Sequence, residues 1–337
     1  MASGVDGHGR RPVSRILITG GTGFIGRALC SMLLNRGFRV SVATRSPRVA
    51  ETIGRVDVRA VPGVGPGVDW SAALRDVDAV VHLAARTPAR NADSNQHLLR
   101  DLRRVNVEGA RKLAEDAAAA GVQRFVYVSA AGVHGPSTGP DQSFRESDPP
   151  APADLNTQLK WDAEQALSQV AKAFGLELFV LRPPLVYGPG VKGDFLALLR
   201  RLEKARVLPV SGARGGHLPR RSLVYVENLC DAIACCLAAT GTTGATFLVR
   251  DGEDLTTGEI LRSLVNTMQR DVRVVQVPKL LFPTAVRLTG NGTALDCVGA
   301  SFCINDSAIR QQLGWKPPRT VVEGFDATVA WFASSSH

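Results

Sequence analysis

The stretch Ile16-Leu-Ile-Thr-Gly-Gly-Thr-Gly-Phe-Ile-Gly26 reads as a buried strand, a glycine-rich turn and the start of a helix in direct succession. Glycines in such a turn let backbone N–H groups approach a pyrophosphate, and the positive end of the following helix faces the anion. Leu29, Met32 and Leu33 continue the helix with apolar residues at helical spacing. This context predicts a dinucleotide site; a glycine-rich hairpin without a ligand is the weaker alternative.

Composition bounds the class of protein. The chain has 337 residues, 45% of them hydrophobic, and a mean hydropathy of +0.02, so its length accommodates one large α/β domain and a smaller lobe. The cysteines form no C-x-x-C pair and have no histidine at ligand spacing, which predicts reduced thiols, no metal site and a cytoplasmic location. No apolar run has membrane-spanning length, and the polar residues 1–14 read as a disordered leader.

The charge of the chain is strongly basic. A formal net charge of +9 and a pI near 9.6 favour anionic ligands or a loosely attracted anionic surface. The arginines are spread along the chain with few aromatic residues among them, which argues against nucleic-acid binding. Arg200-Arg201 with Glu203-Lys204 is interpreted as a solvated helix face.

Strand and helix signals alternate through residues 15–182, which predicts an α/β fold, a doubly wound parallel sheet of the Rossmann type, for the dinucleotide-binding domain. From residue 183 onward proline and glycine loops interrupt the alternation. Residues 183–337 are therefore expected to form mainly a smaller α/β substrate-binding lobe, and a return of some segments to the first domain is left open. The predicted strands are 15–19, 39–43, 56–61, 78–83, 124–129, 176–181, 245–249 and 272–277, and the predicted helices are 24–36, 71–75, 95–120, 156–174, 194–204, 226–239, 257–269, 307–313 and 322–332.

The end of the second strand bears on the choice of cofactor. NAD-binding proteins usually carry an acidic residue about twenty positions after the glycines. Here Thr44 stands at that point, followed by Arg45 and Arg48. Loss of the carboxylate removes a repulsion, and the arginines offer a partner for a 2′-phosphate. NADP(H) is therefore predicted over NAD(H), with solvated loop arginines as the alternative.

Several motifs taken together resemble a known family. They are Thr19–Gly26, His82-Leu-Ala-Ala85, Asn106, Lys160-Trp161, Arg182-Pro-Pro-Leu-Val-Tyr-Gly-Pro189 and Arg221-Ser-Leu-Val-Tyr-Val-Glu-Asn228. From residue 15 to residue 332 the chain resembles the extended short-chain dehydrogenase/reductase family of NAD-dependent epimerases and dehydratases, in particular its nucleotide-sugar epimerase/4-ketoreductase branch of bacterial polysaccharide biosynthesis. The resemblance implies an oxidoreductase or isomerase, and a homodimer that pairs through the helices at 95–120 and 156–174.

The resemblance also implies roles for individual residues. Lys160 matches the lysine that hydrogen-bonds the nicotinamide ribose, and its charge would lower the pKa of a neighbouring acid. Arg221 matches the arginine that grips the diphosphate of the sugar nucleotide. Cofactor contacts are implied for Gly20, Gly23, Phe24, Ile25, Gly26, Leu83, Ala84, Ala85, Lys160, Pro183 and Leu185.

Three positions depart from the family's pattern. The family's proton-donating tyrosine, four residues before the lysine, is Asn156 here, and its helper serine or threonine is Ala130. Asn156 cannot act as a general acid, and Ala130 has no polar side-chain atom. Asp194 stands where the family usually has an asparagine facing the nucleotide, and its carboxylate would repel a diphosphate unless it is protonated or turned away.

Substitutes for the missing catalytic groups are few. Ser129 is expected to point to the opposite face of its strand. His134, on a substrate-side loop, is suited to acid–base work, although a solvated loop histidine is commoner. Tyr187 could approach the ligand, although packing is commoner, and Glu164 reads as a surface residue. Lys160 alone is then left to polarise a carbonyl while the cofactor supplies hydride.

The sequence thus leaves two hypotheses. The first is an enzyme, an NADP(H)-dependent reductase or epimerase acting at C4 of a nucleotide-linked hexose, with a UDP-sugar as the preferred substrate. The second is a catalytically impaired dinucleotide-binding scaffold or regulator, motivated by Asn156, Ala130 and Asp194. The enzyme is preferred, because the cofactor turn, Lys160 and Arg221 are all retained.

Overall fold

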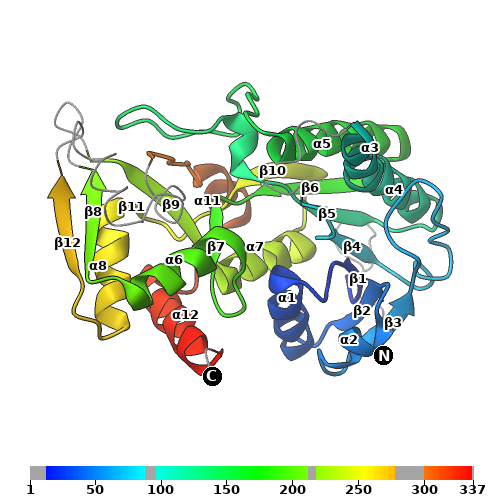
Figure 1. Cartoon of the computed structure of the whole chain (residues 1–337). Coiled ribbons are helices and arrows are strands. Elements are labelled where there is room, and N and C mark those ends of the chain that lie inside the picture. Colours follow the sequence, from blue (N-terminus) through cyan, green and yellow to red (C-terminus); the bar gives the residue numbers. More distant parts are fainter. Residues whose placement is uncertain (1–12, 88–95, 212–217, 278–299, 336–337) are drawn as a thin grey trace.

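A seven-stranded parallel sheet runs through the middle of the molecule (Figure 1). The computed structural model describes residues 13–87, 96–211, 218–277 and 300–335. The strand order is β10-β6-β5-β4-β1-β2-β3, so the order reverses between β1 and β4, and the predicted doubly wound sheet is confirmed. The strands are β1 (Arg15–Thr19), β2 (Arg39–Thr44), β3 (Asp57–Ala60), β4 (Ala79–His82), β5 (Arg124–Val128), β6 (Glu177–Arg182) and β10 (Gly244–Leu248).

Helices cover both faces of the sheet. α1 (Phe24–Asn35) and α7 (Val226–Ala238) lie on one face, while α4 (Gly109–Ala119) and α5 (Leu155–Phe174) lie on the other (Figure 1). Strand β1 is therefore buried on both sides. Ile16 and Ile18 belong to the core that includes α1 and α7, whereas Leu17 belongs to the core that includes α4 and α5.

The helix predicted over residues 95–120 consists of three joined segments. A π-helical turn, η1 (Arg104–Glu108), joins α3 (Gln96–Arg103) to α4. Within this turn the Asn106 amide accepts a hydrogen bond from the Arg86 N–H at 2.7 Å and donates one to the Arg86 carbonyl at 2.9 Å. A π-turn places this side chain where a regular helix would not, so that it fixes the loop that leaves β4.

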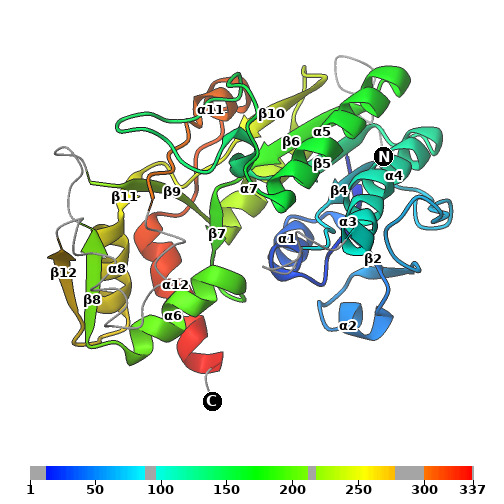
Figure 2. The same cartoon turned by 45° about the horizontal axis from the view of Figure 1, so that its top comes forward.

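The described residues after β6 form two small sheets, in what we call the smaller lobe, and also return to the main sheet (Figure 2). In the lobe, β7, β9 and β11 form one sheet, and β8 pairs in parallel with β12. β10 and α7 come from the same part of the chain but belong to the seven-stranded sheet and its helical layer. The lobe elements are β7 (Leu185–Tyr187), α6 (Gly193–Lys204), β8 (Val207–Ser211), β9 (Arg220–Tyr225), β11 (Asp254–Thr256), α8 (Thr257–Thr267), β12 (Arg273–Val277) and α12 (Val321–Ser335), whereas α11 (Ser307–Leu313) packs against β10.

Several short elements differ from the sequence prediction. Residues 71–75, predicted as a helix, form a turn instead. This turn lies between Trp70, which is buried, and Asp76, which is exposed and has a φ of 59°. The left-handed backbone at Asp76 ends this segment before a regular helix forms. The strands β7, β8, β9 and β11 and the helix α2 (Pro47–Glu51) were not predicted, because each is short and the strands depend on distant partners. The predicted leader lies outside the described residues except for its last two, and within the described ranges no helix is long and apolar enough to cross a membrane.

Candidate functional site

The crevice between the carboxyl ends of β1 and β4 is where a ligand binds in a sheet of this order. The Leu83 N–H donates to the Thr19 carbonyl at 3.1 Å, and the Ala84 N–H donates to the Thr19 hydroxyl at 3.4 Å. These bonds hold the loop after β4 against the loop after β1. Gly20 is thereby brought next to the predicted adenosine-side residues, Leu83 to Ala85, at the carboxyl ends of β1 and β4.

The glycine turn is shaped for close backbone contact. Gly20 has a φ of +74°, and a Cβ there would lie 2.7 Å from the Ala84 nitrogen; at Gly26 a Cβ would lie 2.2 Å from the Gly20 carbonyl oxygen. α1 then begins at Phe24 and Ile25 with Gly23 as its N-cap, without a capping side chain or an acidic residue in its first turn. An uncapped helix start with no negative charge fits the diphosphate of a dinucleotide.

The end of β2 carries the residues predicted to select the cofactor. The Thr44 hydroxyl accepts a hydrogen bond from the Ser46 N–H at 3.0 Å and is buried. Arg45 and Arg48 are exposed, and no acidic residue stands at positions 44 to 48. The guanidinium groups are thus accessible to an anion at this end of the crevice.

Lys160 lies near the start of α5, at the other end of the crevice. An Asp154–Thr157 capping box starts this helix, which leaves Lys160 in its second turn. The Lys160 ammonium donates to the Val128 carbonyl at 2.7 Å and sits 4.8 Å from the centre of the Tyr127 ring. Burial lowers the pKa of Lys160 to about 8, against the opposing effect of the Glu164 charge. This lysine can therefore exchange a proton near neutral pH.

Asn156 and Ala130 flank Lys160 but supply no acid. Asn156 is partly buried in the first turn of α5, and Ala130 directly precedes a 3-10 turn, η2 (Ala131–His134). η2 and α5 touch, since a Cβ on Gly132 would lie 2.8 Å from a Thr157 methyl group. The structure brings the three positions of the family's catalytic set to one place, where only Lys160 can titrate.

The predicted nicotinamide side follows directly from β6. The Ala131 N–H donates to the Pro183 carbonyl at 2.8 Å, so the chain that leaves β6 runs beside the chain that leaves β5. Leu185 begins β7 and is partly exposed, whereas Pro183 is buried. Pro183 can therefore contribute to the predicted nicotinamide side only through its backbone. Leu185 is the residue there with an accessible side chain.

Behind Lys160 lies a buried polar network that the sequence interpretation missed. Glu164 is 4% exposed and forms an ion pair with Arg182, whose Nε lies 3.1 Å from one carboxylate oxygen, and it also accepts a hydrogen bond from the Ser129 hydroxyl. The interpretation of Glu164 as a surface residue is therefore wrong. The Ser129 side chain is directed into this network, which agrees with its predicted absence from the catalytic set.

His134 belongs to the same network and is not an accessible loop residue. Its Nε2 lies 2.8 Å from an Arg182 nitrogen, and its ring stacks on Phe144 with the centroids 5.5 Å apart. Burial, and then the Arg182 charge, lower the pKa of His134 to about 4. The prediction of His134 as a loop acid is corrected accordingly: at neutral pH the ring is uncharged, 3% exposed and occupied by structural contacts.

The structure places the three predicted substrate-side residues, Tyr187, Asp194 and Arg221, in different environments. Tyr187 is fully buried and donates its hydroxyl hydrogen to Asp251 at 2.8 Å, so the prediction of a ligand contact is wrong and the packing alternative holds. Burial raises the pKa of Asp251 to about 6. Asp194 is exposed in the first turn of α6. Arg221 is partly buried in β9, where its guanidinium donates to the Ala300 carbonyl at 3.2 Å. The guanidinium carbon also lies 5.4 Å from the centre of the Phe302 ring.

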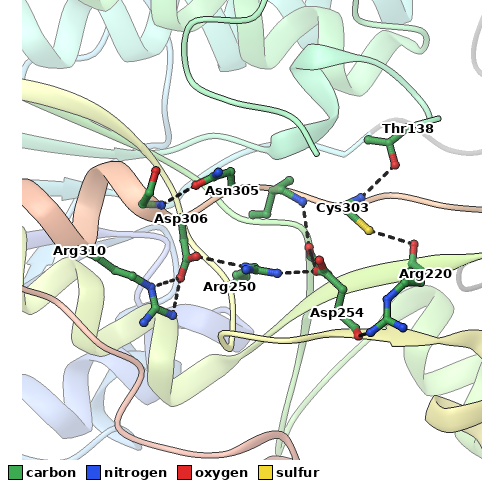
Figure 3. Close-up of polar contacts among 11 residues, drawn as sticks. Thr138, Arg220, Arg250, Asp254, Cys303, Asn305, Asp306 and Arg310 are labelled. Atoms are coloured by element: carbon green, nitrogen blue, oxygen red, sulfur yellow. Dashed lines mark hydrogen bonds and ion pairs between the residues drawn. The ribbon is translucent and has the colours of Figure 1, made fainter. Parts of the chain in front are cut away.

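An ion network fixes the chain segment beside Arg221 (Figure 3). Arg250 contacts the carboxylates of Asp254 at 2.8 Å and Asp306 at 3.1 Å, and Arg310 contacts Asp306 at 2.7 Å. The Phe302 N–H donates to the Arg220 carbonyl at 2.8 Å, which holds residues 300–306 along β9. The position of Arg221 is thus set by partners from distant parts of the chain.

Comparison with known proteins agrees with this architecture. The model of the "NAD dependent epimerase/dehydratase family" matches residues 16–249. A UDP-glucose 4-epimerase of Vibrio cholerae is 32% identical over 97% of this chain and 98% of its own length, and a ceramide reductase of Caulobacter vibrioides is 25% identical over 95% of each. A UDP-glucuronic acid 4-epimerase of Bacillus cereus solved with NAD has a TM-score of 0.75 at 19% identity, covering 96% of this chain and all of that one. These relatives are enzymes, and the predicted fold and family are confirmed: the chain belongs to the NAD-dependent epimerase/dehydratase family.

Proposed function

We propose that the protein is an NADP(H)-dependent reductase or epimerase that acts at C4 of a nucleotide-linked hexose, with UDP as the nucleotide. The observation that carries this proposal is the 32% identity to a UDP-glucose 4-epimerase over nearly the whole of both chains. The uncapped start of α1 and the accessible Arg45 support the cofactor half of the proposal. A homodimer in the cytoplasm, serving polysaccharide synthesis, is part of the same proposal.

Lys160 is the group that handles the proton. When bound, the cofactor supplies or accepts a hydride. In the reducing direction the Lys160 ammonium, at the carboxyl end of β5, donates its proton to the oxygen of a 4-keto group, and the neutral amine that remains is compatible with its buried setting. Asn156 can donate an amide hydrogen bond to the same oxygen but keeps its protons. On the substrate side, Arg221 is the candidate partner for the diphosphate.

The test measures turnover and coenzyme binding separately. Purified protein is mixed with NADPH or NADH and a UDP-4-keto-hexose, and in parallel with UDP-glucose and oxidised coenzyme. We expect NADPH oxidation, or interconversion of the C4 epimers, together with coenzyme binding by calorimetry. Because one relative is a ceramide reductase, a long-chain ketone serves as a third substrate. Turnover of the ketone alone would refute the nucleotide-sugar assignment and leave the reductase.

A second candidate function is a dinucleotide-binding regulator. Asn156 and Ala130 favour it, because the position of the family's catalytic hydroxyls is present but no acid occupies it. Under this alternative the protein binds coenzyme, the unaltered chain gives no turnover, and Asn156→Tyr with Ala130→Ser produces some. Turnover by the unaltered chain that Lys160→Ala abolishes would exclude the regulator.

A further inference from the structure

Residues from the segments 204–207 and 269–273 line a basic hollow. These segments lead from α6 into β8 and from α8 into β12, at the end of the lobe that lies away from α2 and β3 (Figures 1 and 2). The volume of the hollow is about 770 Å³. Four of its eight lining residues are cationic and one is acidic, which distinguishes it from the mixed charge of an ordinary surface. The lining residues are Lys204, Ala205, Arg206, Val207, Gln269, Arg270, Asp271 and Arg273.

Backbone contacts assemble the hollow from two distant segments. β8 and β12 pair in parallel, and the Arg273 N–H donates to the Arg206 carbonyl at 2.9 Å, which places these two arginines at the same end of both strands. After α8 the chain reverses at Gln269, whose φ is +51°. The Arg270 guanidinium then donates to the Glu203 carbonyl at the end of α6. The cations are therefore held together by the fold itself.

No carboxylate neutralises the four cations of the hollow within the part of the chain that the structure describes. Across the described ranges, Lys204, Arg206, Arg270 and Arg273 have no carboxylate within ion-pair distance. By contrast, Lys112 on α4 pairs with Asp116 one turn later, at 2.7 Å. The negative end of the α6 dipole stabilises Lys204, in the last turn of that helix, and Arg270, which donates to the Glu203 carbonyl, but it supplies no full counter-charge. The mutual repulsion of the four cations is relieved when an external anion binds.

Exposed valines beside the hollow indicate which kind of anion. Val207 is 43% exposed and Val275 is 44% exposed. Paired and alternate residues of parallel strands share a face, so Val207, Arg273 and Val275 lie on the same face of the β8–β12 pair. Cations beside accessible apolar side chains suit an anionic lipid surface, where headgroups meet the arginines and the valines reach the interface. The phosphate backbone of a nucleic acid would use the cations alone.

We propose that the β8–β12 end of the lobe is a docking surface for anionic phospholipid membranes, reached through Arg206, Arg270 and Arg273 with Val207 and Val275 beside them. Docking there would not cover the carboxyl ends of β1 and β4, which lie away from β8 and β12 (Figure 1). The formal net charge of +9 acts in the same direction by attracting the whole chain to the surface.

The experiment measures sedimentation of the full chain with vesicles. We expect binding to phosphatidylcholine vesicles that contain about 30 mol% phosphatidylglycerol and none to pure phosphatidylcholine. Arg206→Gln with Arg273→Gln should lower the partition coefficient by about tenfold or more, since each cation near an anionic surface contributes about fivefold. Arg55→Gln with Arg75→Gln removes the same charge from exposed positions outside the hollow and should change binding less than threefold, roughly.

Three outcomes would overturn the proposal. If the two double substitutions, Arg206→Gln with Arg273→Gln and Arg55→Gln with Arg75→Gln, weakened vesicle binding equally, the chain would be attracted by its net charge alone. Unchanged vesicle binding in Val207→Ser with Val275→Ser, or stronger binding of the unaltered chain to duplex DNA or polyglutamate than to the vesicles, would show that the hollow is not a lipid surface. Thermal melting and coenzyme binding of each variant verify the fold, and neither readout depends on the proposed enzymatic activity.

Discussion

The two ends of the crevice differ in what holds their geometry. At the glycine turn the shape is set by backbone against backbone, as where Gly26 meets the Gly20 carbonyl. Around Lys160 the proposed chemistry depends on side chains, and Asn156 and Ala130 stand at the positions where the resemblance places the family's tyrosine and its helper hydroxyl. Backbone contacts cannot be exchanged without a clash, whereas side chains at a ligand-facing position can. The glycine turn, the proposed cofactor end, is therefore the constrained region, and the surroundings of Lys160, the proposed proton-transfer end, are the variable one.

The largest effect is expected from Gly26→Ala. Its Cβ would stand 2.2 Å from the Gly20 oxygen and 2.6 Å from the Gly21 Cα, so the turn or the helix must move. We expect coenzyme affinity, measured by calorimetry, to fall by about a thousandfold or more. The reason is that the backbone N–H groups of the turn would no longer point toward the diphosphate. Gly67→Ala is the matched control, since a Cβ there meets no atom within 4 Å. Normal affinity in Gly26→Ala would show that the turn does not hold the coenzyme.

At the variable end, Lys160→Met should lower kcat by about a thousandfold, as expected for loss of a general acid. Lys172→Met, exposed near the end of the same helix, should leave kcat unchanged. The reduction rate of the unaltered chain should fall as pH rises through about 8, because the ammonium form is then lost. A rate that stays flat beyond that pH would assign the proton to another group.

The lowered pKa of Lys160 should also affect how the free energy of unfolding depends on pH. Its folded-state pKa, about 8, lies below its ordinary value of 10.5, so between these pH values the unfolded chain binds more protons than the folded one. The free energy of unfolding of the unaltered chain should therefore rise more steeply over this range than that of Lys160→Met. Parallel denaturant titrations of the two proteins measure the difference, and identical slopes would contradict a buried amine.

A smaller effect, on stability, is expected from the network behind Lys160. Glu164→Gln leaves the buried Arg182 without its counter-charge and should destabilise the fold by about 3 kcal/mol, measured by denaturant unfolding. Glu115→Gln breaks the Arg111–Glu115 pair on the surface of α4 and should cost about 0.5 kcal/mol or less. Equal effects of the two substitutions would mean that the network does not support the proton-transfer end.

Glu164 also shows where sequence reasoning stops. Its position four residues after Lys160 places both on one side of α5, but its partner Arg182 ends a strand 18 residues later, and only the packed sheet brings them together. The strands of the lobe pose the same difficulty, because β9 acquires its neighbours from residues 185–187 and 254–256. The glycine turn and the long alternating elements were predictable because their signals are local in sequence.

The smallest effect sharpens the comparison within the cofactor end itself. Backbone contacts there cannot distinguish NAD(H) from NADP(H), so the choice falls to the exposed Arg45 and Arg48 at the end of β2. Arg45→Ala should weaken NADPH binding by about tenfold, the effect of one hydrogen bond to a charged group, and leave NADH binding unchanged. Arg55→Ala, exposed after α2, is the control. If Arg45→Ala weakened the binding of NADPH and NADH equally, Arg45 would contact a part of the coenzyme that both share. Side-chain variation at this end would then change the affinity for both coenzymes rather than select between them.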